Sequence, residues 1–182
     1  MFAKGGRYAI GLLLGCVGAC GETTGPVQID SQAVANQVTA AIVSATFLVA
    51  PYSQGDKTWV DLRVDGAGSG FAVVGGTFTK TQLQQVGDPV AHKYDAAVEF
   101  SDFCDNCETR PRLSGTVGLS GTTTAHTGSS IPFTGSWLLT ASIRLAGAFT
   151  GSVVLELEVS QLGAGWLGQL EVDGGSWTVF GP

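Results

Sequence analysis

The hydrophobic pattern of the chain changes from helical spacing to strand alternation near Lys57. Between Ser31 and Ala50, apolar residues recur at the spacing of one helix face: Val34, Val38, Ala41, Ile42, Ala45, Leu48 and Val49. Asp30 or Ser31 can cap the start of this helix, and Pro51 ends it. Because the segment lacks the Lys and Arg residues of membrane-surface helices, we expect it to pack on the rest of the domain.

From Lys57 onward, apolar and polar residues alternate with a period of two, which is typical of strands with one wet face. The apolar positions of the clearest runs are Val60, Leu62 and Val64; His92, Tyr94, Ala96, Val98 and Phe100; Phe133, Trp137, Leu139, Ala141, Ile143 and Leu145; and Val153, Leu155, Leu157 and Val159. Shorter candidates cover 71–78, 113–119, 166–172 and 177–180. Short glycine-rich connections favour antiparallel neighbours. The pattern predicts a mainly β domain, an antiparallel meander of about seven or eight strands. It would be a curved sheet or a barrel, with the N-terminal helix packed on it.

The first residues of the chain have the pattern of an export signal. Lys4 and Arg7 precede an apolar run over residues 8–17. This run is shorter than the ~20 residues that a membrane-spanning helix needs. A short apolar run behind positive charge favours a signal peptide over the alternative, an N-terminal core strand or helix.

The end of this run carries a cysteine motif. Val17-Gly18-Ala19-Cys20 resembles the lipobox of bacterial lipoprotein precursors, in which an aliphatic residue and two small residues precede the cysteine. Residues 13–16 fit less well, because Leu14 is bulky where a small residue is usual. The resemblance is limited to this segment, and it implies cleavage before the cysteine and a lipid on its sulfur.

The resemblance also implies a location. Acyl chains on Cys20 would hold the protein stably on a membrane, and Gly21, rather than Asp, after the cysteine implies the outer membrane of a host with two membranes. Processing at Cys20 would discard Cys16 and leave an even pair of cysteines. We therefore expect a signal peptide over 1–19, a lipidated tether over 20–29 and a single β-rich domain over 30–182. The domain would face the periplasm or the cell surface.

The remaining cysteines, Cys104 and Cys107, form a CxxC motif at an expected hairpin tip. Outside the cytoplasm, the pair predicts a structural disulfide across a tight loop. A thiol–disulfide redox site is the alternative, but the acidic neighbours Asp102 and Glu108 would oppose a thiolate. A zinc site would need two further ligands. We expect no metal, although His92 and His126 are available.

Other chemistry-bearing residues have simpler interpretations. His92 falls on the apolar register of its strand, which predicts a core or rim position, and His126 lies in a polar segment expected to be a solvent loop. Two carboxylate pairs are expected on wet strand faces rather than across a glycosidase cleft: Glu156 with Glu158, and Glu171 with Asp173. The glycine-rich segment 66–70 lacks the lysine and spacing of a phosphate-binding loop. Most tryptophan and phenylalanine residues should be core.

Composition narrows the functional classes. The formal net charge is −6 and no basic cluster is present, which argues against nucleic-acid binding. With no catalytic arrangement in the sequence, we expect a lipid-anchored, non-enzymatic binding or structural domain without a cofactor. An apolar ligand held among the aromatic side chains is one version of this hypothesis, and its partner is otherwise unidentified. A periplasmic thiol–disulfide oxidoreductase using Cys104 and Cys107 is the alternative.

The lipobox assignment predicts different fates for two cysteine variants. Cys20→Ser should remain unprocessed or lose its membrane attachment, because the lipid-bearing sulfur is removed. Cys16→Ser should be processed and anchored as the wild type is. Labelled-palmitate incorporation and membrane fractionation would measure this, and the reverse outcome would assign the lipid to Cys16.

Overall fold

One helix and eight strands make up the described part of the chain. The computed structural model describes residues 28–51, 55–82, 89–125, 133–161, 165–172 and 175–181. The helix is α1 (Gln32–Val49). The strands are β1 (Lys57–Asp65), β2 (Ser69–Gln82), β3 (Val90–Cys104), β4 (Pro111–Ala125), β5 (Phe133–Gly147), β6 (Gly151–Gln161), β7 (Gly165–Val172) and β8 (Gly175–Gly181).

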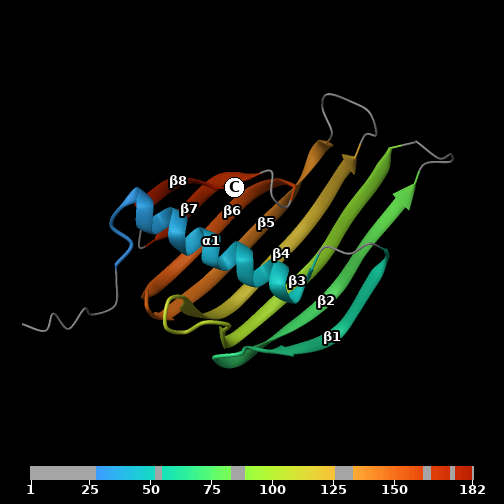
Figure 1. Ribbon diagram of the computed structural model, residues 1–182. Helices are drawn as coiled ribbons and strands as arrows, with labels where there is room; N and C mark the ends of the chain where they lie inside the picture. Colours follow the sequence, from blue (N-terminus) through green and yellow to red (C-terminus); the bar gives the residue numbers. More distant parts are fainter. Residues whose placement is uncertain are drawn as a thin grey trace, which may run out of the picture.

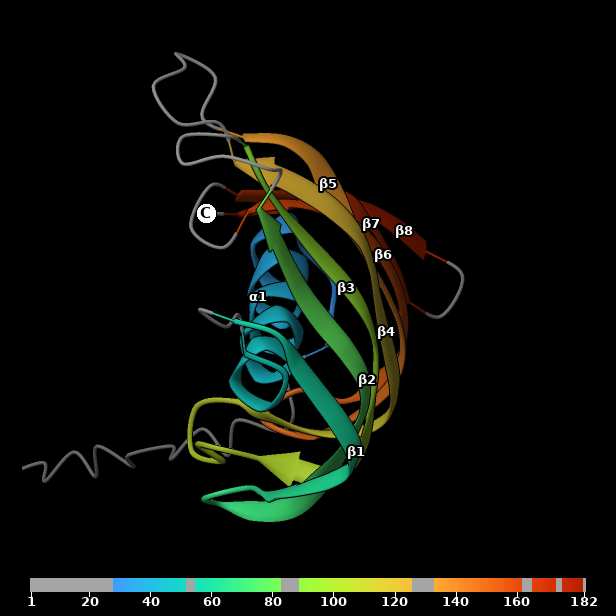
Figure 2. The same cartoon turned by 90° about the vertical axis from the view of Figure 1, so that its right-hand side faces the viewer.

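The strands form one antiparallel sheet in which sequence order is also spatial order, from β1 to β8. The sheet curves strongly, and α1 lies across its concave face (Figures 1 and 2). Strand pairing among the described residues leaves β1 and β8 as edges. The predicted mainly β class and packed N-terminal helix are confirmed, and the sheet is open and curved rather than a closed barrel.

Helix α1 begins at the predicted cap. The Ser31 side chain accepts a hydrogen bond from the Val34 N–H at 3.4 Å, which satisfies one of the free amides of the first turn. By length and composition α1 could cross a membrane, but half of it is buried inside the domain. Core helices pass the same test, so this property alone does not place the helix in a bilayer.

The buried face of α1 differs from the predicted stripe. The apolar spacing predicts that Leu48 is buried, but it is 54% exposed, whereas Thr39 and Thr46 are fully buried. Each threonine hydroxyl donates to the carbonyl four residues earlier, Ala35 at 2.9 Å and Ile42 at 2.8 Å. Because these internal bonds satisfy the hydroxyls, threonine can occupy the interface as a small apolar residue.

The inward residues of β3, of β5 from Trp137 onward and of β6 follow the predicted alternation and form the core with α1. The side chain of Phe133, the first residue of the predicted β5 run, lies outside the described residues. Tyr94 lies at the centre of an aromatic cluster beside the end of the helix. Its ring centroid is 4.8 Å from that of Phe78, 4.9 Å from that of Trp137 and 6.0 Å from that of Phe47. The Tyr94 hydroxyl donates to the Ala50 carbonyl at 3.3 Å. This bond ties the end of α1 to the sheet.

Strand β1 departs from the predicted alternation. The pattern places Val60 and Leu62 on the apolar face, but they are 80% and 45% exposed, and Trp59 is buried instead. The pairing with β2 shifts between Trp59 and Leu62, and Asp61 adopts a φ of 49°. The extra residue in β1 is a β-bulge, and it brings Trp59 and Leu62 to the same face, where Trp59 pairs with Gly76 and Leu62 with Val74. Val60 therefore points outward. Leu62 shares the face of the buried Val74 but is exposed on the edge strand.

The opposite edge, on β8, is contacted by the first turns of α1. The Gln32 side-chain amide donates to the Thr178 carbonyl at 2.7 Å, and the Asn36 side-chain carbonyl accepts from the Phe180 N–H at 3.2 Å. Gln32 also donates to Asn36 at 3.0 Å. The helix therefore supplies hydrogen bonds to an edge strand that has no ninth strand beside it among the described residues.

The helix–sheet interface predicts a contrast between two aliphatic substitutions in α1. Ile42→Ala removes fully buried volume and should lower the free energy of unfolding by about 2–5 kcal/mol. Leu48→Ala, on the exposed side of the same helix, should change it by less than about 0.5 kcal/mol. Urea unfolding followed by circular dichroism would measure both, and equal losses would contradict this placement of α1.

Candidate functional site

Several sequence-predicted positions lie outside the described residues. These are the lipobox cysteine Cys20, the competing Cys16, His126 and Asp173. Lipidation and the signal peptide therefore stay predictions. The end of the expected tether is described at Ile29, which packs partly buried against the core.

Cys104 and Cys107 lie at the β3–β4 connection, as the hairpin prediction required. Their sulfurs are joined as a disulfide, with the two Cα atoms 5.6 Å apart. Cys104 is buried and Cys107 is exposed. The glycine-rich turn between β1 and β2 packs against this loop. The Gly68 N–H donates to the Cys104 carbonyl at 2.9 Å, and a Cβ at Gly68 would lie 2.5 Å from the Cys107 sulfur. This turn therefore has a packing role beside the disulfide.

The surroundings of the cysteine pair favour a structural role over a redox role. Arg110 is held in an ion pair with Asp105 at 2.7 Å and also donates to Ser44 on α1 at 3.2 Å. The pair follows a strand rather than starting a helix, so it lacks the helix N-terminus that commonly lowers a thiol pKa. The loop links the helix to the sheet.

His92 lies on the inner face of β3 and is 4% exposed. Its ring stacks on Phe78, with centroids 6.1 Å apart, and its carbonyl accepts a hydrogen bond from the Trp137 indole at 3.2 Å. Burial, and secondarily the charge of Lys80, lower the pKa of His92 below its usual value. This is the environment of a core histidine kept neutral.

The concave face of the sheet is filled by packed side chains. Trp59 and Trp166 are each 7% exposed, and Trp137 is fully buried. The cluster around Tyr94 joins Phe47 of α1 to the sheet. These aromatic residues contact one another and the helix, so they form the core rather than the lining of an open cavity.

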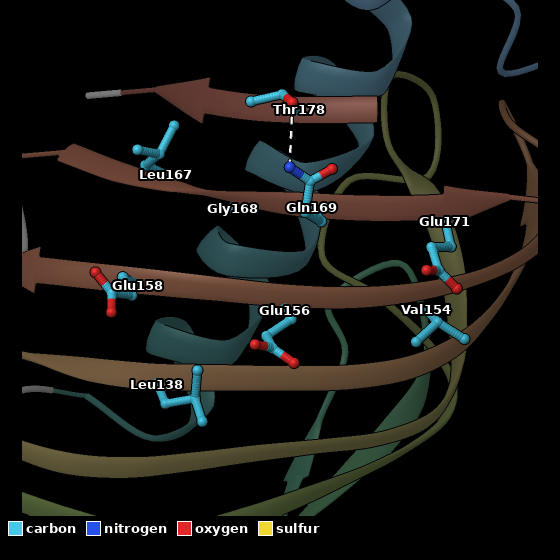
Figure 3. Close-up of a pocket in the computed structure, with 9 residues that line it drawn as sticks. All are labelled: Leu138, Val154, Glu156, Glu158, Leu167, Gly168, Gln169, Glu171 and Thr178. Atoms are coloured by element: carbon cyan, nitrogen blue, oxygen red, sulfur yellow. Dashed lines mark hydrogen bonds between the residues drawn. The ribbon is translucent and has the colours of Figure 1, made fainter. Parts of the chain in front are cut away.

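A groove of about 600 Å³ lies instead on the outer face of β5–β8. Figure 3 shows the side chains that line it, projecting from neighbouring strands away from α1. We call this the outer groove. Its lining residues are Leu138, Val154, Glu156, Glu158, Leu167, Gly168, Gln169, Glu171 and Thr178.

Strand register places the polar residues of the outer groove in one row. Glu156 faces Gln169 on β7, which in turn faces Thr178 on β8. Gln169 donates to the Thr178 hydroxyl at 3.1 Å and accepts from the Ser176 hydroxyl at 3.2 Å. The middle of the groove therefore has an ordered polar floor.

Gly168 allows β7 to pack closely against β6. A Cβ there would collide with the Glu156 carbonyl oxygen and would lie 2.7 Å from the Leu157 Cα. Only a residue without a side chain lets β7 approach β6 this closely. Gly168 pairs with the buried Leu157 and Val179, so its missing side chain would point to the inner face, and its backbone lines the outer groove.

The carboxylates of the outer groove take part in no ion pair among the described residues. The ion pairs of the described structure lie elsewhere, within β1–β4 and their connecting loops. They join Arg63 to Asp65, Arg110 to Asp105 and Arg112 to Asp102. Arg144 is the only Lys or Arg in residues 133–182, and it pairs in register with Ser152, four residues from Glu156 along β6. The outer groove is thus an anionic surface.

Large apolar side chains are exposed on the same face. Leu138 is 39% exposed, Val154 53%, Leu167 58% and Phe180 57%. Leu167 pairs with Phe180 across β7 and β8, and with Glu158 on β6. Exposed apolar residues that gather around a hollow are typical of an interaction surface.

Sequence reasoning identified the groove carboxylates as wet-face residues, which is where they lie, but it missed the groove itself. A usable signal was the apolar residue at outward positions of three successive strands, 138, 154 and 167. Within the described ranges, His, Cys, Asp and Glu residues form no group of three that could hold a metal.

The environment of His92 predicts a pH dependence of stability. In the unfolded chain the pKa of His92 takes its ordinary value of 6.5, but in the folded chain the pKa is lower. The unfolded state therefore binds more protons between the two values, and stability should fall as pH drops from 7 towards 5. Urea unfolding across this range should give a flatter slope for His92→Gln than for the wild type. An unchanged slope in His92→Gln would refute this assignment.

Comparisons with protein-family models, with curated protein sequences and with solved structures gave no match.

Proposed function

We propose that this chain is a lipid-anchored cell-envelope protein whose β domain binds a partner at the outer groove and catalyses no reaction. The lipobox-like segment ending at Cys20 supports the anchor. The outer groove supports the binding role, because a hollow lined by exposed apolar side chains favours contact with another molecule.

The observation that carries the proposal is the contrast between the two faces of the sheet. The concave face buries its aromatic residues against α1, which removes the space that an apolar ligand would need there. The outer face has the groove of about 600 Å³, a volume within the range of small-ligand and side-chain pockets. We therefore place the binding site on the outside of the sheet and not among the aromatic side chains.

The non-enzymatic part of the proposal follows from the groove chemistry. Its carboxylates lie beside Gln169 and Thr178, and among the described residues no histidine, cysteine or lysine lines it. Glu156 and Glu158 project from the same strand, two residues apart. A glycosidase needs its two carboxyl groups on opposite sides of the scissile bond, and the pair Glu156 and Glu158 is not arranged that way.

Site-directed photocrosslinking in the producing cells tests this proposal. A photoreactive phenylalanine analogue at Leu167, in the outer groove, should give a discrete crosslinked product in the membrane fraction. The same analogue at Thr122, exposed on the outer face of β4, is the matched control and should give none. Products of equal yield at both positions, or no product at Leu167 and at Val154, would refute binding at the groove.

A further inference from the structure

We infer that the partner of the outer groove is a basic amphipathic segment of another protein. Its Lys or Arg side chains would meet the groove carboxylates, and its aliphatic side chains would cover the exposed apolar residues. This inference rests on the proposed binding function and adds the chemistry of the occupant.

The charge of the groove selects a cationic occupant. Glu156 and Glu158 lie two residues apart on β6, a separation of ~6.6 Å in an extended strand. Glu171 pairs with Val154 on the neighbouring strand, so it lies diagonally across from Glu156. With no cation of the described structure in an ion pair with these three carboxylates, positive charge on the partner would complement the surface.

The exposed apolar residues require that the occupant also carry aliphatic groups. Leu138, Glu158, Leu167 and Phe180 form one cross-strand row, in which a single carboxylate lies between large apolar side chains. A cation without hydrocarbon side chains would leave these residues in water. An amphipathic polypeptide segment can pair with Glu158 and cover its neighbours together.

The same charge argues against other occupants. A second copy of this chain seated face to face would place carboxylates opposite carboxylates, which is repulsive. Anionic lipid headgroups and nucleic acid would be repelled for the same reason. The acidic and apolar character of the surface therefore favours a partner of opposite charge.

The dimensions fit one segment of a partner. Strands β5 to β8 are separated by three inter-strand spacings, or ~14 Å across the sheet. An α-helix with its side chains is ~10–12 Å in diameter. The groove can therefore hold one helix or one extended segment.

Peptide binding to the full processed chain in a neutral detergent tests this inference. The probe is a fluorescent amphipathic peptide of leucine and lysine, and the comparison probes are its leucine–glutamate counterpart and spermine. Fluorescence anisotropy should show saturable binding of the basic peptide only, above the signal of empty micelles. Binding should weaken as salt is raised, because the exposed charges are screened.

Matched double variants locate the binding. The double variant Glu156→Gln with Glu158→Gln should bind the basic peptide about tenfold more weakly, since two exposed ion pairs are lost. Asp95→Asn with Glu99→Gln removes the same charge from the outer face of β3 and should leave binding unchanged. Leu167→Ser should weaken binding without altering its salt dependence.

Three results would overturn the inference. These are equal loss in both double variants, equal binding of the leucine–glutamate peptide, and spermine binding as tight as that of the basic peptide. The photocrosslinking result separates the two proposals. A crosslink at Leu167 without basic-peptide binding would support binding at the groove by a partner of different chemistry. A missing crosslink would refute both proposals.

Discussion

The fold depends on one helix covering the apolar face of an open eight-stranded sheet. Helix α1 has eighteen residues. It could cover only part of a flat eight-stranded sheet, and much of the apolar inner face would then lie in water. The sheet instead curves around the helix (Figure 2), and residues of both meet in one core. Thr39 and Thr46 contribute to this contact because each hydroxyl bonds its own helix backbone. The Tyr94 hydroxyl fixes the far end of the helix.

Filling the concave face moves any binding role to the outside of the sheet. Cys104 and His92 are both buried, and each contacts residues that join strands or the helix to the sheet. The two halves of the outer face differ in their charged residues. Ion pairs of the described structure lie around β1–β4, whereas the β5–β8 side has glutamates with Arg144 as its one basic residue. This asymmetry, together with the exposed Leu167 and Phe180, gives the proposed partner its chemistry.

The sequence predicted those features that depend on neighbouring residues. Alternation identified the inner faces of β3, β5 and β6, and the CxxC spacing identified the loop after β3. The helix phase was partly wrong, because hydroxyl-to-backbone bonding makes Thr46 compatible with burial and leaves Leu48 outside. The bulge at Asp61 gives the inner position to Trp59 instead of Val60, and Leu62 is exposed because β1 is an edge strand. Both features are visible only in the strand pairing. The outer groove was missed because Leu138, Val154 and Leu167 come to line one hollow only through the registers of three strands. The signal and anchor segment lies outside the described residues and stays a prediction.

The two edges of the sheet are closed to growth in different ways. At β8, Gln32 and Asn36 already use a carbonyl and an amide that an incoming strand would need. At β1, the bulge at Asp61 and the charged residues of the strand are features that oppose edge-to-edge pairing. A sheet that is terminated at both ends cannot readily recruit another chain as a further strand. This favours association through a face of the sheet, where side chains decide which partner fits, over backbone pairing, which accepts almost any sequence.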